Sequence, residues 1–238
     1  MEFTDENPLS RNHRGYTHPH PRRRYKRAKR PHRTCGRDPR TDRRRHEPRI
    51  LHGVHGVKNT GDTEKEVVEV GKINCYGCGA LVDDIEGKPH KYIGAVQGCW
   101  NLYGQILSRE YCEYNYPELT HRLTVDTYAI QHPGQPSKQS IQSVNIHLIS
   151  LYLILCKSLS GKIVTKILGG IIARKPKFEW IEAPVPNGTK TIIDVLAANG
   201  KEEHEIKVRE WAENVWDFWY KKHGKTIEKI VNENYGER

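Results

Sequence analysis

Two cysteines separated by two residues form the most informative chemical pattern in the chain. Cys75 and Cys78 lie in the run Cys-Tyr-Gly-Cys-Gly, whose glycines let the backbone turn tightly. Two thiolates at this spacing can bind one tetrahedral ion, as in a zinc knuckle. A redox-active pair has the same spacing, but it is expected between a strand and a helix, whereas this motif continues into acidic residues. The pattern therefore favours a Zn²⁺ site.

A structural zinc site needs two more ligands, and the chain has no second cysteine pair at zinc-ribbon spacing to provide them. Cys99 is the preferred third ligand, because it opens a predicted helix whose free amides and dipole favour a thiolate, and because Gly98 permits close approach. Cys99 is equally compatible with a role as a small buried apolar residue. For the fourth ligand we choose His132; the alternatives are His90, Cys112, His121 and His147.

An acidic residue occupies an apolar position of the helix predicted over residues 117–131. Leu119, Leu123 and Ile130 form one stripe, and Asp126 falls within it. Burial of a carboxylate costs several kcal/mol unless the group is paired or bound to a metal. We therefore expect Asp126 to have a partner, such as Arg122, a histidine or an ion.

A histidine on the next predicted helix can provide that partner. His147 lies among apolar residues and should point into the bundle, where a satisfied core histidine is the plainer alternative. Short connections place consecutive helices side by side and antiparallel, so His147 can approach Asp126 or His121. Such a carboxylate–imidazole pair orients a metal ligand or tunes a base. Asp126, His147 and His121 are thus the candidate catalytic residues, and with His132 they are expected to line a polar pocket near the ion.

The apolar periodicity predicts a mainly α protein, a helical bundle with little strand content and a Cys turn at its N-terminal end. A helix over 99–111 should place Trp100, Tyr103, Leu107 and Tyr111 on one face. The helix over 117–131 should end at Pro133-Gly134, and Ser137 should cap a third helix with a stripe from Ile141 to Leu155.

Three further helices are expected towards the C-terminus. One covers 162–173, and a proline-rich loop over 175–188 follows, packed by Phe178 and Trp180. Thr191 and Asp194 form a capping box that opens a helix ending before Gly200. The last helix carries a broad apolar stripe made of Val208, Trp211, Ala212, Val215, Phe218 and Trp219.

The net charge of +10 belongs to the N-terminal part of the chain. Residues 1–58 contain 17 lysines and arginines against 6 acidic residues, and the remainder contains 22 against 23. Residues 1–66 are predicted to be a disordered basic tail, because they offer too few apolar side chains to offset the entropy of ordering. Residues 67–238 are predicted to form one helical metal-binding domain. The tail can contact nucleic acid through phosphates, but a solvated arm or a reading frame extended too far upstream is an alternative.

The location is expected to be cytoplasmic. No apolar stretch follows the N-terminal arginines as a secretory signal requires. The longest apolar run, over 141–156, is interrupted by Asn145, His147 and Ser150, whereas a membrane span needs about 18 apolar residues. We therefore expect no membrane segment.

The chain resembles an uncharacterised bacterial family, a domain of unknown function, over about residues 73–231. The family has a Cys-x-x-Cys-Gly opening, a Gly-Cys-Trp, a long His-Arg-Leu-x-Val-Asp-x-Tyr-x-x-Gln-His-Pro-Gly block and a Ser-Val-x-x-His-Leu helix. The matching segments here are 75–79, 98–100, 121–134 and 143–148, and the Trp-rich end over 211–223 also looks similar. The resemblance implies no reaction and does not include the arginine-rich tail.

The sequence thus predicts a zinc-binding helical protein with a His/Asp pocket. If it is an enzyme, metal-assisted hydrolysis is the simplest chemistry, with an open coordination position activating water and Asp126 or a histidine moving the proton. No nucleophile elbow, phosphate loop, dinucleotide fingerprint or metalloprotease helix is present. The alternatives are a nucleic-acid-binding module with a structural zinc, and a structural interaction domain.

Overall fold

The computed structural model describes residues 71–235. The predicted tail over 1–66 lies outside these residues, so its disorder and its contact with nucleic acid stay predictions. The described chain is mainly α, as predicted. It begins with two short strands and continues through six α-helices: β1 (Lys72–Asn74), β2 (Leu81–Asp83), α1 (Gln97–Ser108), α2 (Glu118–Gln131), α3 (Lys138–Leu151), α4 (Gly161–Ala173), α5 (Ile192–Leu196) and α6 (Lys201–Tyr235).

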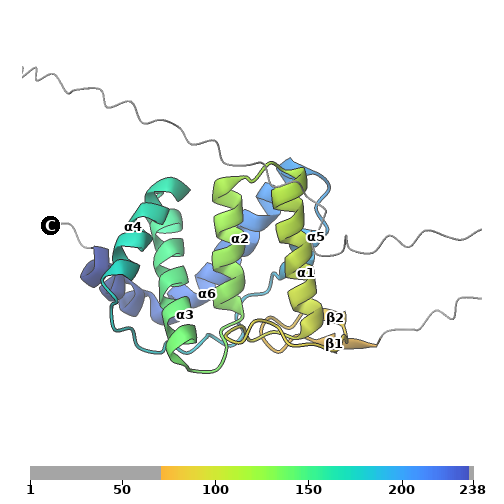
Figure 1. The fold of residues 1–238 in the computed structure, drawn as a ribbon, viewed down its shortest axis with the longest axis horizontal. Coiled ribbons are helices and arrows are strands. Elements are labelled where there is room, and N and C mark those ends of the chain that lie inside the picture. The colour runs from red at the N-terminus through yellow and green to blue at the C-terminus, as the bar shows by residue number, and fades with distance from the viewer. Residues whose placement is uncertain (1–70, 236–238) are drawn as a thin grey trace, which may run out of the picture. The chain divides into compact units, whose positions relative to one another are not determined.

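The helices form a row that is crossed by the longest of them. Figure 1 shows α1, α2, α3 and α4 side by side, with α6 passing behind them and the β1–β2 hairpin at one end of α1. Helix α2 packs against both α3 and α6. It is therefore the central helix of the bundle, with one end close to the hairpin.

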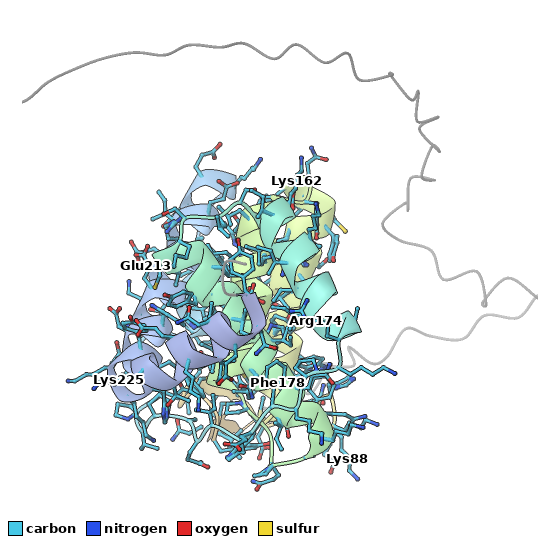
Figure 2. All side chains as sticks on the ribbon, turned by 90° about the vertical axis from the view of Figure 1, so that its left-hand side faces the viewer. Lys88, Lys162, Arg174, Phe178, Glu213 and Lys225 are labelled. Atoms are coloured by element: carbon cyan, nitrogen blue, oxygen red, sulfur yellow. The ribbon has the colours of Figure 1, made fainter. Side chains whose placement is uncertain are left out.

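Two helices begin at the capping residues that the sequence predicted. Ser137 caps α3 and Thr191 caps α5, each in a reciprocal capping box. Helix α6 buries Val208, Trp211 and Trp219 on the predicted stripe. The outer faces of the helices are charged: Figure 2 shows Lys162, Glu213 and Lys225 projecting from them. An apolar inner stripe and a charged outer face explain why these helices pack as a bundle.

Two helices end in a wider π-helical turn, which the periodicity did not predict. Helix α1 continues into η1 (Arg109–Glu113) and α3 into η2 (Tyr152–Cys156). The wider turn changes which side chains face inward. Glu110 is fully buried, whereas Tyr111, predicted on the apolar face, is 55% exposed. The predicted inward position of Leu119 is also wrong, since this residue is 38% exposed at the start of α2.

Helix α3 and η2 together form one long apolar helix. Over Lys138–Cys156 this helix is apolar enough and long enough to cross a membrane, but 61% of it is buried within the fold. Most of this helix is therefore covered by the rest of the fold. The cytoplasmic location stays a prediction.

A buried amide ties the proline-rich loop to the bundle. The Gln131 side chain, at the end of α2, donates to the carbonyl oxygens of Asn187 at 3.0 Å and Lys190 at 2.9 Å. Its oxygen accepts from the indole nitrogen of Trp211 on α6 at 3.0 Å. Asn187 donates back to the carbonyl oxygens of Ile130 and Gln131. Because every group of this buried amide is paired, the loop and α6 have a fixed position against α2.

Replacing Gln131 with leucine should therefore destabilise the fold. Gln131→Leu introduces an apolar side chain of similar size and leaves the Trp211 N–H and two carbonyls without their partner. We expect a loss of about 3 kcal/mol in urea-induced unfolding. Gln142→Leu on the exposed face of α3 is the control and should change stability by about 0.5 kcal/mol or less. Equal effects of the two substitutions would contradict the role given to Gln131.

Candidate metal centre and polar pocket

The hairpin brings two of the predicted ligands together. Strands β1 and β2 pair antiparallel with Asn74 opposite Leu81, so the intervening residues form a tight loop. The loop is closed by backbone hydrogen bonds from Cys75 to Ala80 at 2.8 Å and from Gly79 to Cys75 at 2.7 Å. Gly79 has a φ of +77°, a conformation that glycine adopts without strain. Cys75 is buried by the loop and Cys78 is partly exposed.

The third thiol comes from the first turn of α1, close to β2. Cys99 is the third residue of this helix and is fully buried. A Cβ on the preceding Gly98 would lie 2.1 Å from the carbonyl oxygen of Asp83, so only glycine lets the helix approach the hairpin this closely. The Cys99 sulfur lies 3.9 Å from the Cys78 sulfur.

The fourth donor is His132, the residue that ends α2. Its Nδ1–H donates to the Tyr128 carbonyl oxygen at 2.9 Å, one turn back in the same helix. In the neutral imidazole this bond keeps the proton on Nδ1 and leaves the lone pair on Nε2, which lies 3.4 Å from the Cys99 sulfur. Metal-binding histidines commonly use their second nitrogen in this way.

The four donors form one compact cluster. The ligand atoms of Cys75, Cys78, Cys99 and His132 all lie within 4.8 Å of one another. Three thiolates and one imidazole are a donor set that suits tetrahedral Zn²⁺. Within the described part of the chain, this is the one group of three or more such donors close enough to share an ion, and it includes none of His90, Cys112, His121 and His147.

The crowding of the sulfurs changes their acidities in opposite directions. Hydrogen bonds from Cys78 and Cys99 lower the pKa of Cys75, although burial opposes this. Hydrogen bonding with Cys75 and Cys78 raises the pKa of Cys99, and burial adds to the effect. Burial alone would lower the pKa of His132, but contacts with Cys75 and Cys78 raise it to about 9. The cluster favours one negative charge and resists a second, which a divalent cation would relieve.

An aromatic wall encloses the cluster on the helix side. The Tyr128 hydroxyl donates to the Cys99 sulfur at 3.6 Å, and burial raises the pKa of Tyr128, so the hydroxyl keeps its proton. The Tyr128 ring stacks on His132 on one side and on Tyr103 on the other, with centroids 4.0 Å apart in both cases. These contacts hold the imidazole in position and cover Cys99 and His132, whereas Cys78 stays partly exposed.

A separate polar pocket of about 360 Å³ lies along α2, α3 and α4. His147 and Asp126 line it, and the His147 Nδ1–H donates to the Asp126 carboxylate at 2.7 Å. Ser150 donates to the other carboxylate oxygen. Asp126 is therefore buried with both oxygens paired, as the sequence required of an acidic residue at an apolar position.

His121 lines the same pocket but is held by a different carboxylate. Its Nδ1–H donates to Glu110 at 2.6 Å, and its Nε2 accepts from the Tyr111 hydroxyl at 3.2 Å. Glu110 also accepts from His204 at 3.0 Å and from Thr124 at 2.6 Å. Burial raises the pKa of Glu110, but these hydrogen bonds from His121, His204 and Thr124 together bring it below its usual value. Glu110 thus remains a carboxylate inside the bundle.

The structure divides the predicted site residues into two groups. His121, Asp126 and His147 line the pocket, whereas His132 belongs to the thiol cluster and does not line it. The expectation of one pocket containing all four residues is therefore wrong. Sequence reasoning also missed Glu110 and His204, because the π-helical turn that buries Glu110 breaks the periodicity and His204 lies far away in the chain.

The fold and the Cys₃His cluster define a helical-bundle protein with a candidate metal centre. The chain belongs to a family of unknown function, DUF5946, whose model matches residues 73–220. This match confirms the resemblance to an uncharacterised family. No curated protein and no solved structure matches the chain.

Adding one methyl group at the loop should open the cluster. A Cβ on Gly77 would lie 2.3 Å from the Gly94 carbonyl oxygen and 2.5 Å from the His132 ring. We expect Gly77→Ala to displace the loop from α2, weaken binding of any metal ion by the four donors and reduce stability by about 2 kcal/mol. Gly104→Ala, where nothing lies within 4 Å, is the control and should be neutral or stabilising. Urea unfolding measures both effects, and unchanged stability of Gly77→Ala would contradict this packing.

The buried Glu110 carboxylate should make the stability of the fold depend on pH. A carboxyl whose pKa is lower in the folded state stabilises that state above its usual pKa of about 4.3, and the effect is lost as the pH falls through the folded value. We expect Glu110→Gln to cost about 2 kcal/mol at pH 7 and to flatten the loss of stability below about pH 5. Urea unfolding at several pH values tests this. Exposed Glu213→Gln is the control, and parallel pH curves for wild type and Glu110→Gln would exclude the effect.

Proposed function

We propose that the protein binds one zinc ion through Cys75, Cys78, Cys99 and His132, and that the ion is a structural centre of the helical domain. The observation that supports this most directly is the meeting of four donor atoms within 4.8 Å of one another. Three of the four residues are buried, so without a cation they would be polar groups enclosed by the fold.

The ion would join parts of the chain that are distant in sequence. Two ligands lie on the hairpin loop, one on the first turn of α1 and one directly after α2. The hairpin pairs only three residues from each strand, and an isolated two-stranded hairpin is at most marginally stable. A structural zinc site contributes its binding energy to folding. The ion would thus hold the hairpin against the ends of the two helices.

This donor set does not favour metal-assisted hydrolysis at the same ion. A catalytic zinc usually has three protein ligands and keeps a fourth position for water, whereas here protein groups supply all four. The candidate proton-transfer residues also belong to another cavity, since Asp126 and His147 line the pocket along α2, α3 and α4. Any reaction of this protein would therefore take place away from the zinc.

The other functional alternatives have less support. The nucleic-acid hypothesis depends on the basic tail over 1–66, which lies outside the described residues. The described domain alone is compatible with a zinc-stabilised interaction module. Neither alternative changes the proposed role of the ion.

Metal analysis of the full-length protein tests the proposal. We expect near one zinc per chain after purification without added metal. Cys78→Ser should lose its zinc at a much lower chelator concentration than the wild-type protein does. Its melting temperature should fall by about 10 °C, which corresponds to about 3 kcal/mol for a domain of this size. Cys156→Ser, which removes an exposed free thiol elsewhere, should change neither value.

Two results would contradict the proposal. If the purified protein contains neither zinc nor any other bound metal, the metal centre is excluded. Loss of zinc from Cys78→Ser with unchanged melting behaviour would show that the ion does not stabilise the fold.

A further inference from the structure

We propose that the pocket lined by His147, Asp126 and Arg122 binds a small molecule with a carboxylate or phosphate group, and that His147 is a general base acting on that molecule. This inference does not depend on the zinc ion, because the pocket shares no residue with the metal cluster.

The tautomer of His147 is fixed in the form that a base requires. Nδ1–H donates to the Asp126 carboxylate at 2.7 Å, which leaves Nε2 with a free lone pair. The His147 side chain is 22% exposed and Asp126 is 1% exposed, so the imidazole reaches the pocket while its partner stays inside the bundle. Because Ser150 donates to the second oxygen of Asp126, the carboxylate is also held in place. Asp126 and Ser150 are positioning residues in this arrangement.

The proposed step is a simple proton transfer. The Nε2 lone pair of His147 accepts the proton of an acidic O–H on the bound molecule, that of a hydrogen phosphate or a carboxylic acid: the O–H bond breaks, an N–H bond forms, and the molecule is left as its anion beside Arg122. The imidazolium formed at His147 is stabilised by the adjacent Asp126 carboxylate. The proton returns to the departing molecule or passes to water when the pocket empties, and no other bond is formed or broken.

Arg122 supplies the group that would recognise an anion. One terminal nitrogen of its guanidinium donates to the Thr165 hydroxyl at 2.6 Å. Its Nε is buried and has no hydrogen-bond partner within residues 71–235. A guanidinium presents its donors in a planar fork that matches a carboxylate or a phosphate. Arg122 lines the pocket, so the terminal nitrogens of its guanidinium, rather than the enclosed Nε, are the donors that an anionic oxygen of a ligand would meet.

The acidic side chains around the pocket accept hydrogen bonds from the protein or lie beside the N-terminus of α4. Asp126 and Glu110 are buried and accept hydrogen bonds from two and three side chains respectively. Glu118 also lines the pocket, and its Oε1 lies 3.3 Å from the Cβ position of Gly161, the first residue of α4. Its charge thus lies beside a helix N-terminus, which stabilises an acidic group. This arrangement leaves Arg122 as the charge available to a ligand.

Two of the four non-glycine residues with positive φ in the described part of the chain are consecutive, and the second of them lines this pocket. Asn115 and Tyr116 follow one another with φ values of +55° and +49°, and such a conformation is uncommon for a bulky residue such as tyrosine. Tyr116 lines the pocket and packs against His121 and Tyr111, with ring centroids 4.7 and 5.1 Å away. Strained residues that the surrounding structure holds in place cluster at ligand sites.

Chemical modification of the zinc-loaded, full-length protein tests both parts of the inference. Diethyl pyrocarbonate acylates a neutral imidazole nitrogen, and peptide mass spectrometry measures the rate at each histidine. We expect Nε2 of His147 to react at least as fast as exposed His90, although it is less accessible. Inorganic phosphate or acetate should slow the reaction of His147 at least fivefold and leave His90 unchanged. Separate phosphate and acetate arms, with chloride at equal ionic strength, distinguish the two anion classes.

Variants then assign the anion contact. Arg122→Gln should abolish protection by the anion, and Arg209→Gln, at an exposed position on α6, should retain it. The inference is overturned if His147 reacts more slowly than His90, if neither anion protects it, or if protection survives in Arg122→Gln. Zinc content and circular dichroism of each variant show that these readings come from folded protein.

Discussion

Three sulfurs and an imidazole lie within 4.8 Å of one another, and the hairpin, α1 and the end of α2 must approach closely to bring them together. Hydrogen bonds within the cluster lower the pKa of Cys75, whereas hydrogen bonds and burial raise the pKa of Cys99, so the two thiols do not ionise equally easily. The backbone must also approach closely to bring the donors into range. Glycine at 77 and 98 is required for that approach, since a Cβ at either position would overlap a carbonyl oxygen. The glycines therefore permit the close backbone approach that brings the cysteines and His132 together.

The helical bundle also buries two carboxylates, and each of them is paired with hydrogen-bond donors. Asp126 and Glu110 each lie where an apolar side chain would cost less, and each is fully paired with histidine and hydroxyl donors. Asp126 joins α2 to α3, and Glu110 joins η1 to α2 and α6. A buried polar group of this sort fixes one register, because any sliding of the helices would leave a carboxylate unpaired. The histidines at the pocket thus have structural partners whether or not a ligand is bound.

The sequence predicted those parts of the structure that depend on local spacing. The Cys-x-x-Cys turn, Cys99 at a helix start and the helices themselves follow from patterns within a few residues, and the pairing of Asp126 with His147 follows from two apolar stripes. The choice of His132 over other histidines could not be derived, because it depends on where α2 ends in space. Glu110 was missed because a π-helical turn rotates it inward, and nothing in the periodicity of α1 signals that turn. His204 is separated from Glu110 by 94 residues, so only the tertiary structure reveals the contact.

Helix α2 connects the two sites and also keeps them apart. His132 ends this helix, and Asp126, the pocket residue on α2 that is nearest to it in sequence, lies six residues earlier, which corresponds to about 9 Å along the axis at 1.5 Å per residue. This separation is too long for an ion bound by His132 to share a ligand or a water molecule with the pocket. Such an ion can affect the pocket only through the position of α2. That position is also fixed independently, by Asp126 against α3 and by Gln131 against α6. The pocket therefore has structural support of its own, and a function located there need not use the chemistry of the metal.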